Sequence, residues 1–525
     1  MPKVLISDKM SPRAAEIFQE RGIEVSSKHG MKPEELAACI GDYDGLAVRS
    51  ATKATAEILD KALKLKVIGR AGIGVDNIDV PSATAHGVVV MNTPFGNAIT
   101  TAEHAITLMF ALARQIPTAN ASTQAGKWEK SRFMGVELTG KTLGIIGCGN
   151  IGAIVADRAL GLKMKVLAYD PYLAPERATD LCIEKVELND LLARSDFITL
   201  HTPLNDATQD LLNAQTFAKM RDGVRVINCA RGGLINEADL KKAIERGKVA
   251  GAAVDVYPQE PAHENVLFGM EQIIATPHLG ASTSEAQENV AIQVAEQMAD
   301  YLLTGAVTNA INMPSVTAEE AVRLRPYMTL AQQLGSFAGQ MTETGIEAVT
   351  IEYAGQVTEL NTRPLTALAL EGLLAPLMES VNMVNAPMIA RERDIDITEV
   401  KHERETDYQT LIQLVVKTEK QTRSVAGTLF GGDKPRVVQV DDIAVEAELG
   451  SHMLFVTNQD KPGFIGKLGG VLGDNGVNIA TFHLGRKASS GNALALIQVD
   501  GPVDDATLKE VRAISEVLQA HALSF

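Results

Sequence analysis

Short aliphatic runs that alternate with amphipathic stretches constrain the fold of this chain more than any other feature. Within residues 1–95 they occur at "KVLIS", "DGLAVRS", "LKVIGRAG" and "GVVVMNT". Runs this short and this apolar are typical of parallel strands that are buried on both faces. Because both faces need cover, the alternation predicts a parallel sheet with helices packed against it.

The same alternation returns farther along the chain. We expect a single long helix over residues 99–125, which opens a second, larger α/β unit that ends at residue 287. A helical pattern over residues 284–305 is expected to return the chain to the first unit. The expected strands of the second unit lie in "KTLGIIGCGNIG", "KVLAYD", "FITLHTP", "RVINCA", "AGAAVDVY" and "QIIATPH".

The last part of the chain has a different character. Residues 316–450 combine a helical start with strands, a charged run and glycine-rich hairpins, and they carry no recognisable chemical motif. Residues 451–525 follow the order βαββαβ, which is typical of a small ligand-sensing or docking module. The predicted fold class is therefore α/β, with two doubly wound parallel-sheet domains, followed by an α+β domain and a βαββαβ domain.

Composition excludes several classes of protein. The formal net charge of −16 argues against nucleic acid and anionic membranes as partners. The four cysteines form no CxxC pair, so we expect neither a metal site nor a disulfide framework. The first residues lack the layout of a signal peptide, and the longest apolar run, residues 105–113, is too short to span a bilayer. We therefore expect a cytoplasmic protein.

A glycine motif marks a dinucleotide site. Gly147, Gly149 and Gly152 form G-x-G-x-x-G between an expected strand and an expected helix, and Asp170 ends the next strand. The first glycine permits a tight turn, the second lets the backbone approach a pyrophosphate, and the third lets helix and strand pack closely. The helix N-terminus favours phosphate groups. Asp170 can accept a ribose hydroxyl and would repel the additional phosphate of NADP, so the motif predicts NAD.

Three residues fit the needs of a 2-hydroxy acid oxidation. Such a reaction needs a base for the hydroxyl proton, and histidine is the natural base near neutral pH. His278 in "TPHLGAST" fits this role, and Glu260 in "QEP" can hold its ring and stabilise the imidazolium. Arg231 in "NCARGG" can bind the substrate carboxylate. Arg231, Asp255 and His278 each follow an expected strand, so they should meet at the carboxyl edge of one sheet.

These motifs resemble those of the D-isomer-specific 2-hydroxyacid dehydrogenases over residues 1–315. The resemblance rests on "GCGNIG", Asp170, "HTPL", "NCARGG", Asp255, "QEP" and "TPHLGAST". It implies that Arg231 anchors the carboxylate and that Glu260 supports His278 as the acid/base. The NAD contacts that it implies are Gly147, Gly149, Asn150, Ile151, Gly152, Asp170, Thr202, Cys229, Asp255, His278, Gly280 and Ala281.

The first unit carries the expected substrate cations. Arg49, followed by Ser50, and Arg70, followed by the turn Gly72–Ile73–Gly74, each stand at a strand end. Two such arginines can hold a phosphorylated acid against the acidic background. With Arg231 and His278 they form the predicted substrate site.

The whole chain further resembles the long branch of the same family, which has an intervening domain and a terminal ACT domain. The resemblance rests on "RAGIGVDNID", "NTPFGNAITTAEH", "GKWEKSRFMG" and the βαββαβ tail. It implies NAD-dependent oxidation of 3-phosphoglycerate to 3-phosphohydroxypyruvate, which begins L-serine synthesis, by a homo-oligomer, usually a tetramer. The expected domains are a substrate-binding domain (1–98 and 288–315), an NAD-binding domain (99–287), an intervening domain (316–450) and an ACT domain (451–525).

Alternatives remain open at this stage. A glyoxylate or hydroxypyruvate reductase would share the catalytic residues, and an NAD-sensing corepressor would share the fold without turnover. In the tail, Asp460 and Asn478 can bind the amino and carboxylate groups of an effector such as L-serine between two chains, near Asn458. The simpler interpretation is that Asp460 caps a helix and Asn478 fills a turn.

Overall fold

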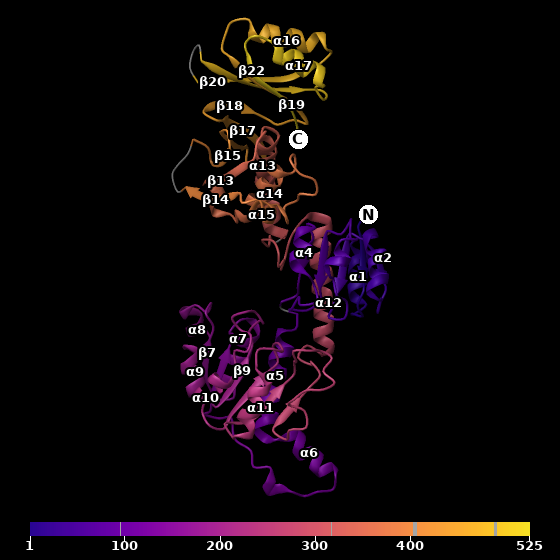
Figure 1. Ribbon diagram of the computed structural model, residues 1–525, viewed down its shortest axis with the longest axis vertical. Coiled ribbons are helices and arrows are strands. Elements are labelled where there is room, and N and C mark those ends of the chain that lie inside the picture. Colours follow the sequence, from indigo (N-terminus) through magenta and orange to yellow (C-terminus); the bar gives the residue numbers. More distant parts are fainter. Residues whose placement is uncertain (95, 317, 403–406, 488–490) are drawn as a thin grey trace.

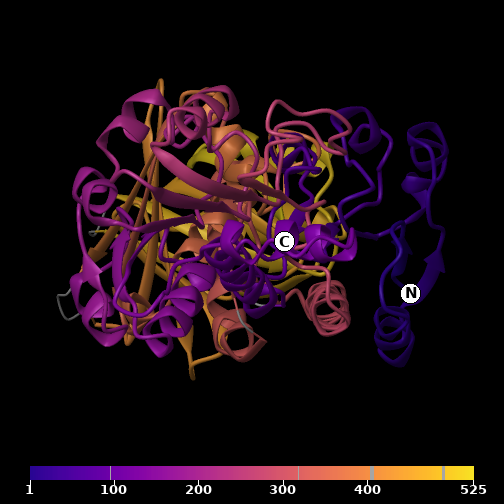
Figure 2. The same cartoon turned by 90° about the horizontal axis from the view of Figure 1, so that it is seen from below.

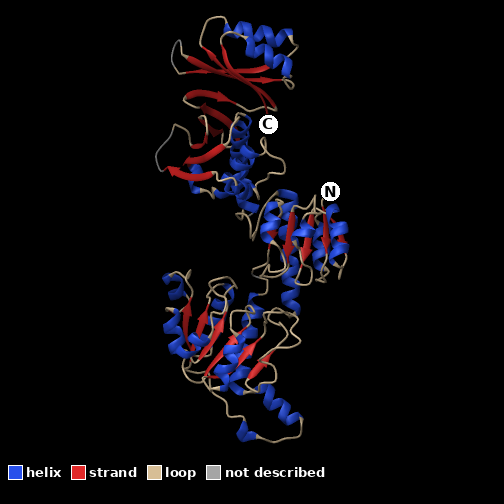
Figure 3. Cartoon of the chain, viewed as in Figure 1, coloured by secondary structure: helices blue, strands red, loops and turns tan. Residues whose placement is uncertain are grey.

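The computed structural model describes the whole chain except residues 95, 317, 403–406 and 488–490. Figure 1 shows an elongated molecule in which the chain begins in a central body, continues into a lower body, returns, and ends in an upper body. Helices cover both faces of the sheets in the central and lower bodies (Figure 3). None of the described helices combines the length and apolar character needed to cross a membrane.

The central body is a parallel sheet with the strand order β2-β1-β3-β4-β5. Four of its strands are short and almost completely buried, as the continuous aliphatic runs require, whereas the edge strand β2 is partly exposed; Val4, Leu46 and Val67 have no exposed surface. The strands are β1 (Lys3–Ile6), β2 (Glu24–Ser27), β3 (Gly45–Val48), β4 (Val67–Arg70) and β5 (Val89–Met91), and the helices are α1 (Arg13–Glu20), α2 (Pro33–Cys39), η1 (Ile40–Asp42), α3 (Ala56–Leu59) and α4 (Val80–Ala85).

The lower body is a seven-stranded parallel sheet with the order β12-β11-β10-β9-β6-β7-β8. The chain starts in the middle of the sheet, at β6, and then builds outward in both directions. The strands are β6 (Thr142–Ile146), β7 (Lys165–Tyr169), β8 (Glu184–Lys185), β9 (Phe197–Leu200), β10 (Val224–Asn228), β11 (Val249–Val254) and β12 (Ile273–Ala275). The helices after β6 are α7 (Asn150–Gly161), α8 (Pro175–Asp180), α9 (Leu188–Arg194), α10 (Ala214–Lys219) and α11 (Glu237–Glu245).

The prediction of a single helix over residues 99–125 is wrong. The structure has α5 (Ala98–Arg114) and α6 (Ile116–Gln124), followed by η2 (Lys130–Arg132). Gln115 between them has a φ of 52°, in the left-handed region. Pro117 explains the break, because proline has no N–H and its ring clashes with the carbonyl of the preceding turn. That carbonyl, of Ala113, accepts a hydrogen bond from Val136 N instead.

Helix α12 (Ser284–Thr304) returns the chain from the lower to the central body, as predicted. Val290, Val294 and Met298 on this helix join the core formed by β1, β3, β4 and β5. Met298 lies directly over Gly69, where any side chain would clash with its sulfur. In Figure 2 the central body lies to one side of the second α/β unit, and α12 is seen nearly along its axis.

The upper body contains two sheets that share a core. The first is mixed, with the order β14-β13-β15-β16-β17-β18, and the second is antiparallel, with the order β20-β21-β19-β22. Met453, Phe455 and Leu496 of the second sheet belong to the same core as Val437 and Val445 of the first. The elements of the first part are α13 (Ala318–Gln340), β13 (Ile346–Gly355), η3 (Gln356–Glu359), α14 (Arg363–Leu374), α15 (Ala386–Glu392), β14 (Asp396–His402), β15 (Thr410–Thr418), β16 (Thr422–Phe430), β17 (Lys434–Val440) and β18 (Ile443–Ala447).

The chain ends in the predicted βαββαβ order. The elements are β19 (His452–Gln459), α16 (Phe464–Asp474), β20 (Ile479–Arg486), β21 (Asn492–Val499), α17 (Asp505–Ala513) and β22 (Val517–Ser524). Leu468, Leu472 and Val511 pack the two helices onto one face of the sheet. The opposite face is the one that packs against the mixed sheet. The predicted α/β class, with two parallel-sheet units and a terminal βαββαβ unit, is confirmed.

Candidate active site

The residues expected to contact NAD lie where strands of the second sheet end. Because parallel strands end at the same edge, they face a common crevice. The turn after β6 and the first residues of α7 hold five of them, and one or more of the others follows each of β7, β9, β10, β11 and β12. In chain order these are Gly147, Gly149, Asn150, Ile151, Gly152, Asp170, Thr202, Cys229, Asp255, His278, Gly280 and Ala281.

The three glycines at the junction of β6 and α7 have the local geometry that a dinucleotide needs. Gly147 has a φ of 92°, and a side chain there would clash with the carbonyl of His201. A side chain at Gly152 would clash with the carbonyl of Gly147, so this glycine lets α7 start close to β6. Around Gly149 the space is open. A phosphate can therefore approach the backbone at Gly149 and the N-terminus of α7.

A pocket extends from this turn toward α8. It is lined by Cys148, Gly149 and Asn150 together with Ile99 on α5 and Arg177 on α8. Asp170 accepts hydrogen bonds from Cys148 N and Tyr172 N, both at 2.8 Å, so its carboxylate also holds the turn in shape. Sequence reasoning missed Arg177. The one sequence signal that could have found it is its positive charge a few residues after Asp170, the expected strand end.

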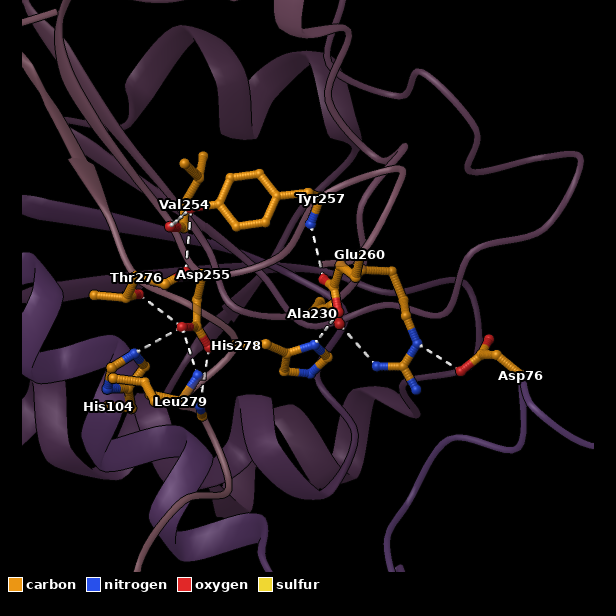
Figure 4. A network of polar contacts seen from close by, with 12 residues as sticks. Asp76, His104, Ala230, Val254, Asp255, Tyr257, Glu260, Thr276, His278 and Leu279 are labelled. Atoms are coloured by element: carbon orange, nitrogen blue, oxygen red, sulfur yellow. Dashed lines mark hydrogen bonds and ion pairs between the residues drawn. The ribbon is translucent and has the colours of Figure 1, made fainter. Parts of the chain in front are cut away.

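A buried carboxylate organises the turn that carries His278 (Figure 4). Asp255 has no exposed surface. Its Oδ1 accepts hydrogen bonds from Thr276 Oγ1 at 2.6 Å and Leu279 N at 2.7 Å, and its Oδ2 accepts one from Gly280 N at 2.8 Å. Burial acts to raise the pKa of Asp255, but contacts from His104, Thr276 and Leu279 outweigh it and hold the pKa below its usual value.

His278 and Glu260 form the predicted pair. Nδ1 of His278 lies 2.7 Å from Oε2 of Glu260, and Oε1 of Glu260 accepts a hydrogen bond from Tyr257 N at 3.0 Å. A carboxylate only accepts, so Nδ1 carries the hydrogen and Nε2 keeps its lone pair. Half of the His278 side chain is exposed. The arrangement can accept a proton at Nε2 and stabilise the resulting cation.

Arg231 connects the two α/β units. Its Nε lies 3.2 Å from Oδ2 of Asp76 in the loop after β4, and its Nη1 donates to Ala230 O at 2.7 Å. A side chain at Gly74 would clash with the Arg231 guanidinium. The turn expected to bind substrate, Gly72–Ile73–Gly74, therefore meets Arg231 directly. Asn92, which sequence reasoning missed, fixes this turn by donating to Ile73 O at 2.6 Å.

The predicted cations of the first unit lie close to Arg231. Burial, and then the charges of Arg231 and Arg49, lower the pKa of Arg70 to about 10, while Asp76 acts in the opposite direction. The buried Nε of Arg70 has no hydrogen-bond partner in the described part of the chain. Arg49, beside Ser50, donates through Nη1 to Lys9 O at 3.1 Å. Three guanidinium groups thus repel one another in a setting that an anion would stabilise.

Unpaired polar atoms gather around the crevice. Among the described residues, nine buried side-chain nitrogen or oxygen atoms lack a hydrogen-bond partner. Buried polar groups are normally paired, so a cluster of exceptions points to a ligand. Five of the nine lie at strand ends, on the linker between the units, or on α5, and belong to Arg70, Thr93, Asn97, His104 and His201.

The three residues of the predicted effector site do not meet within one chain. Asp460 follows β19 and forms an ion pair of 3.2 Å with Arg486, while Asn478 precedes β20 and donates to Asp500 at 2.7 Å. They lie at opposite ends of β21, a strand of eight residues, which corresponds to a separation of roughly 25 Å. Asn458 is 2% exposed, and its Oδ1 has no partner among the described residues.

The fold and the crevice define a class of protein. Residues 106–280 match the family profile described as D-isomer specific 2-hydroxyacid dehydrogenase, NAD binding domain. A crystal structure of a glyoxylate reductase from Paecilomyes thermophila is 30% identical, covers 59% of this chain and 98% of its own, and superposes with a TM-score of 0.55. The chain is therefore an NAD-dependent dehydrogenase of the D-isomer-specific 2-hydroxyacid class, as predicted.

Comparison over the full length narrows this class. Residues 323–441 match the D-3-phosphoglycerate dehydrogenase intervening domain, and residues 452–516 match the ACT domain. D-3-phosphoglycerate dehydrogenase of Synechocystis is 42% identical over 525 residues (100% of this chain, 95% of the relative), and that of Bacillus subtilis is 41% identical over 520 residues (99% and 98%). The chain belongs to the D-3-phosphoglycerate dehydrogenase family.

Two glycine substitutions should separate cofactor binding from folding. Gly149→Val should weaken NADH binding by about tenfold or more, because its side chain enters the open space that a pyrophosphate needs, and should leave the thermal midpoint close to wild type. Gly152→Val should instead lower stability by roughly 1–3 kcal/mol through its clash with Gly147 O. NADH fluorescence titration and thermal unfolding measure the two effects. Equal loss of stability in both variants would contradict the distinction.

Proposed function

We propose that this protein oxidises 3-phosphoglycerate to 3-phosphohydroxypyruvate with NAD, the step that begins L-serine synthesis. The observation that carries the proposal is the His278–Glu260 pair of the second unit together with Arg231, which reaches Asp76 of the first unit and whose charge acts on Arg70, as does that of Arg49. Full-length similarity to D-3-phosphoglycerate dehydrogenases supports the substrate.

The acid/base step belongs to His278. The lone pair of Nε2 accepts the proton of the substrate hydroxyl, and Glu260, 2.7 Å from Nδ1, stabilises the imidazolium that forms. NAD, when bound in the crevice, would supply the acceptor for the hydride from the carbon that bears this hydroxyl. The C–H bond electrons leave as hydride, the O–H proton stays on the imidazole, and the carbon–oxygen bond becomes a carbonyl.

The arginines supply what an acidic chain otherwise lacks. A substrate with a carboxylate and a phosphate carries several negative charges, and the whole chain carries −16. Arg231 binds the carboxylate next to His278, and Arg70 and Arg49 bind the phosphate. Arg70 is well suited, because its partly desolvated guanidinium interacts strongly with an anion and its Nε is unpaired.

We also propose that the protein acts as a homo-oligomer, as a tetramer. Large apolar side chains are exposed on α5, on α6 and in the loop after α6. Helix α6 and this loop project from the lower body in Figure 1. Trp128 is 88% exposed and Met134 79%. Exposed apolar surface of this kind marks a contact with another protein surface. We also propose a cytoplasmic location, in line with four cysteines that are all free.

L-serine is the proposed effector of the terminal domain. Asp460 binds the amino group of one effector molecule, and Asn478 of a second chain binds its carboxylate, with Asn458 behind the turn. The wide separation of Asp460 and Asn478 within one chain supports a site shared by two chains. The shared core between the two upper sheets provides a route for the signal toward the rest of the enzyme.

His278→Gln should lower kcat by about 10²–10⁴-fold, because the hydroxyl proton loses its acceptor, while NADH binding survives. The measurements are steady-state turnover of 3-phosphoglycerate and NADH fluorescence titration. His263→Gln, at an exposed histidine three residues after Glu260 in sequence, is the control and should behave as wild type. Near-wild-type kcat in His278→Gln would refute the assignment.

Arg49→Ala and Arg70→Ala should each raise KM for 3-phosphoglycerate by about tenfold to a hundredfold and leave KM for NAD almost unchanged, because a hydrogen bond to a charged group is lost. Arg13→Ala removes an exposed arginine of the same unit and serves as control. Parallel assays with glyoxylate and hydroxypyruvate test the alternative substrates. Preference for either over the phosphorylated acid would overturn the proposed substrate.

Calorimetry should detect L-serine binding to the full-length protein and no binding to Asp460→Ala. Asp474→Ala, at an exposed carboxylate of α16, should bind as wild type. Because the site needs two chains, sedimentation of the same samples should show an oligomer. An absence of binding heat with the wild-type protein, or unchanged binding to Asp460→Ala, removes this site.

A further inference from the structure

His104 lies beside the site without a role in the chemistry described so far. It is on α5, the helix that follows the linker from the first unit, and its side chain is 18% exposed. Its Nε2 lies 3.4 Å from Oδ1 of Asp255 and has no hydrogen-bond partner in the described part of the chain (Figure 4). The ring therefore faces a completely buried carboxylate.

Asp255 holds the His278 turn on both sides. It accepts from Thr276 Oγ1 before His278 and from Leu279 N and Gly280 N after it. An ionised carboxylate accepts all of these bonds, whereas a protonated one turns one oxygen into a donor. The position of His278, whose own φ is 55°, thus depends on the negative charge of Asp255.

Besides these hydrogen-bond donors, few titratable side chains near Asp255 can stabilise its negative charge. The sulfur of Cys229 lies within 4.8 Å of the nearest polar atoms of His104 and Asp255. Burial raises the pKa of this thiol well above the usual range, so it stays neutral. Burial likewise raises the pKa of Tyr257 to about 12, and its hydroxyl donates to backbone carbonyls. Glu103, the neighbour of His104 on α5, lies 4.0 Å from Arg158. Among these groups, only His104 offers Asp255 a positive charge or a ring N–H.

We propose that His104 is a positioning residue, which keeps Asp255 anionic and through it fixes the turn that presents His278 to the substrate. The proposal rests on the acid/base role of His278 given above. Since α5 begins at Ala98, immediately after the linker, the same contact also ties the helix that joins the two units to the catalytic turn.

The test compares His104→Leu, which removes the ring N–H, with His104→Gln, which keeps a donor. In the leucine variant the buried carboxylate loses the imidazole that faces it at 3.4 Å and takes up a proton more readily as pH falls. We expect kcat to drop about tenfold or more, the acid limb of the kcat profile to move to higher pH, and KM for 3-phosphoglycerate to stay within about twofold of wild type. The glutamine variant should recover most of kcat.

A second measurement does not need turnover. Hydrogen–deuterium exchange of the peptide containing Leu279 and Gly280 should be faster in His104→Leu than in wild type. His29→Leu replaces an exposed histidine of the first unit and should change neither the exchange nor the pH profile. A merely structural role would lower the unfolding midpoint and leave the acid limb in place.

The proposal is overturned if His104→Leu keeps the wild-type acid limb and the wild-type exchange of the 276–280 turn. Failure of the proposed function gives a different result, namely that the wild-type enzyme does not oxidise 3-phosphoglycerate. In that case the exchange measurement and the pH profile with the 2-hydroxy acid that is turned over still decide the role of His104.

Discussion

Parallel strands end at one edge of their sheet, and the site depends on this constraint twice. In the lower sheet it brings together the glycine turn, Asp255 and His278, which are far apart in sequence. In the central sheet it places Arg49, directly after β3, near Arg70, the last residue of the neighbouring strand β4. Helix α12 packs against the central sheet. Arg231, at the edge of the lower sheet, lies 3.2 Å from Asp76, at the edge of the central sheet. Neither sheet alone contains a complete site.

Electrostatics then decide what this crevice can bind. Three arginines converge in a chain with a net charge of −16, and the lowered pKa of Arg70 records the cost of burying one of them beside two others. An anion bound among them would remove that cost, which is the physical basis for the proposed phosphorylated substrate. Opposite them, a buried carboxylate holds the catalytic turn through backbone N–H groups. The crevice thus combines a buried anion that holds a turn of the protein with cations that can attract an anionic ligand.

The upper body is attached to this centre through packing. The loop before α15 reaches the central body, where Asn382 donates to Gly87 O at 3.1 Å and Asn385 donates to Ala85 O at 3.2 Å, at the end of α4. Val384 is buried in the core of the central sheet. Helix α4 itself follows the substrate turn at Gly72–Gly74. The upper body therefore contacts the helix that follows the turn proposed to bind substrate.

Sequence alone determined the elements whose signal is local. The apolar runs, the glycine motif and the strand-end positions of Arg231, Asp255 and His278 follow from periodicity and from the residue types that tight turns require. Sequence did not find the break at Gln115, because the helical pattern continues through it and only Pro117 opposes it. It assigned no role to His104, Arg177 or Asn92, since the neighbours that give each of them a role are distant in sequence. Only the tertiary structure brought His104 to Asp255 and separated Asp460 from Asn478, because both facts depend on which strands are neighbours, and strand order is not encoded in local pattern.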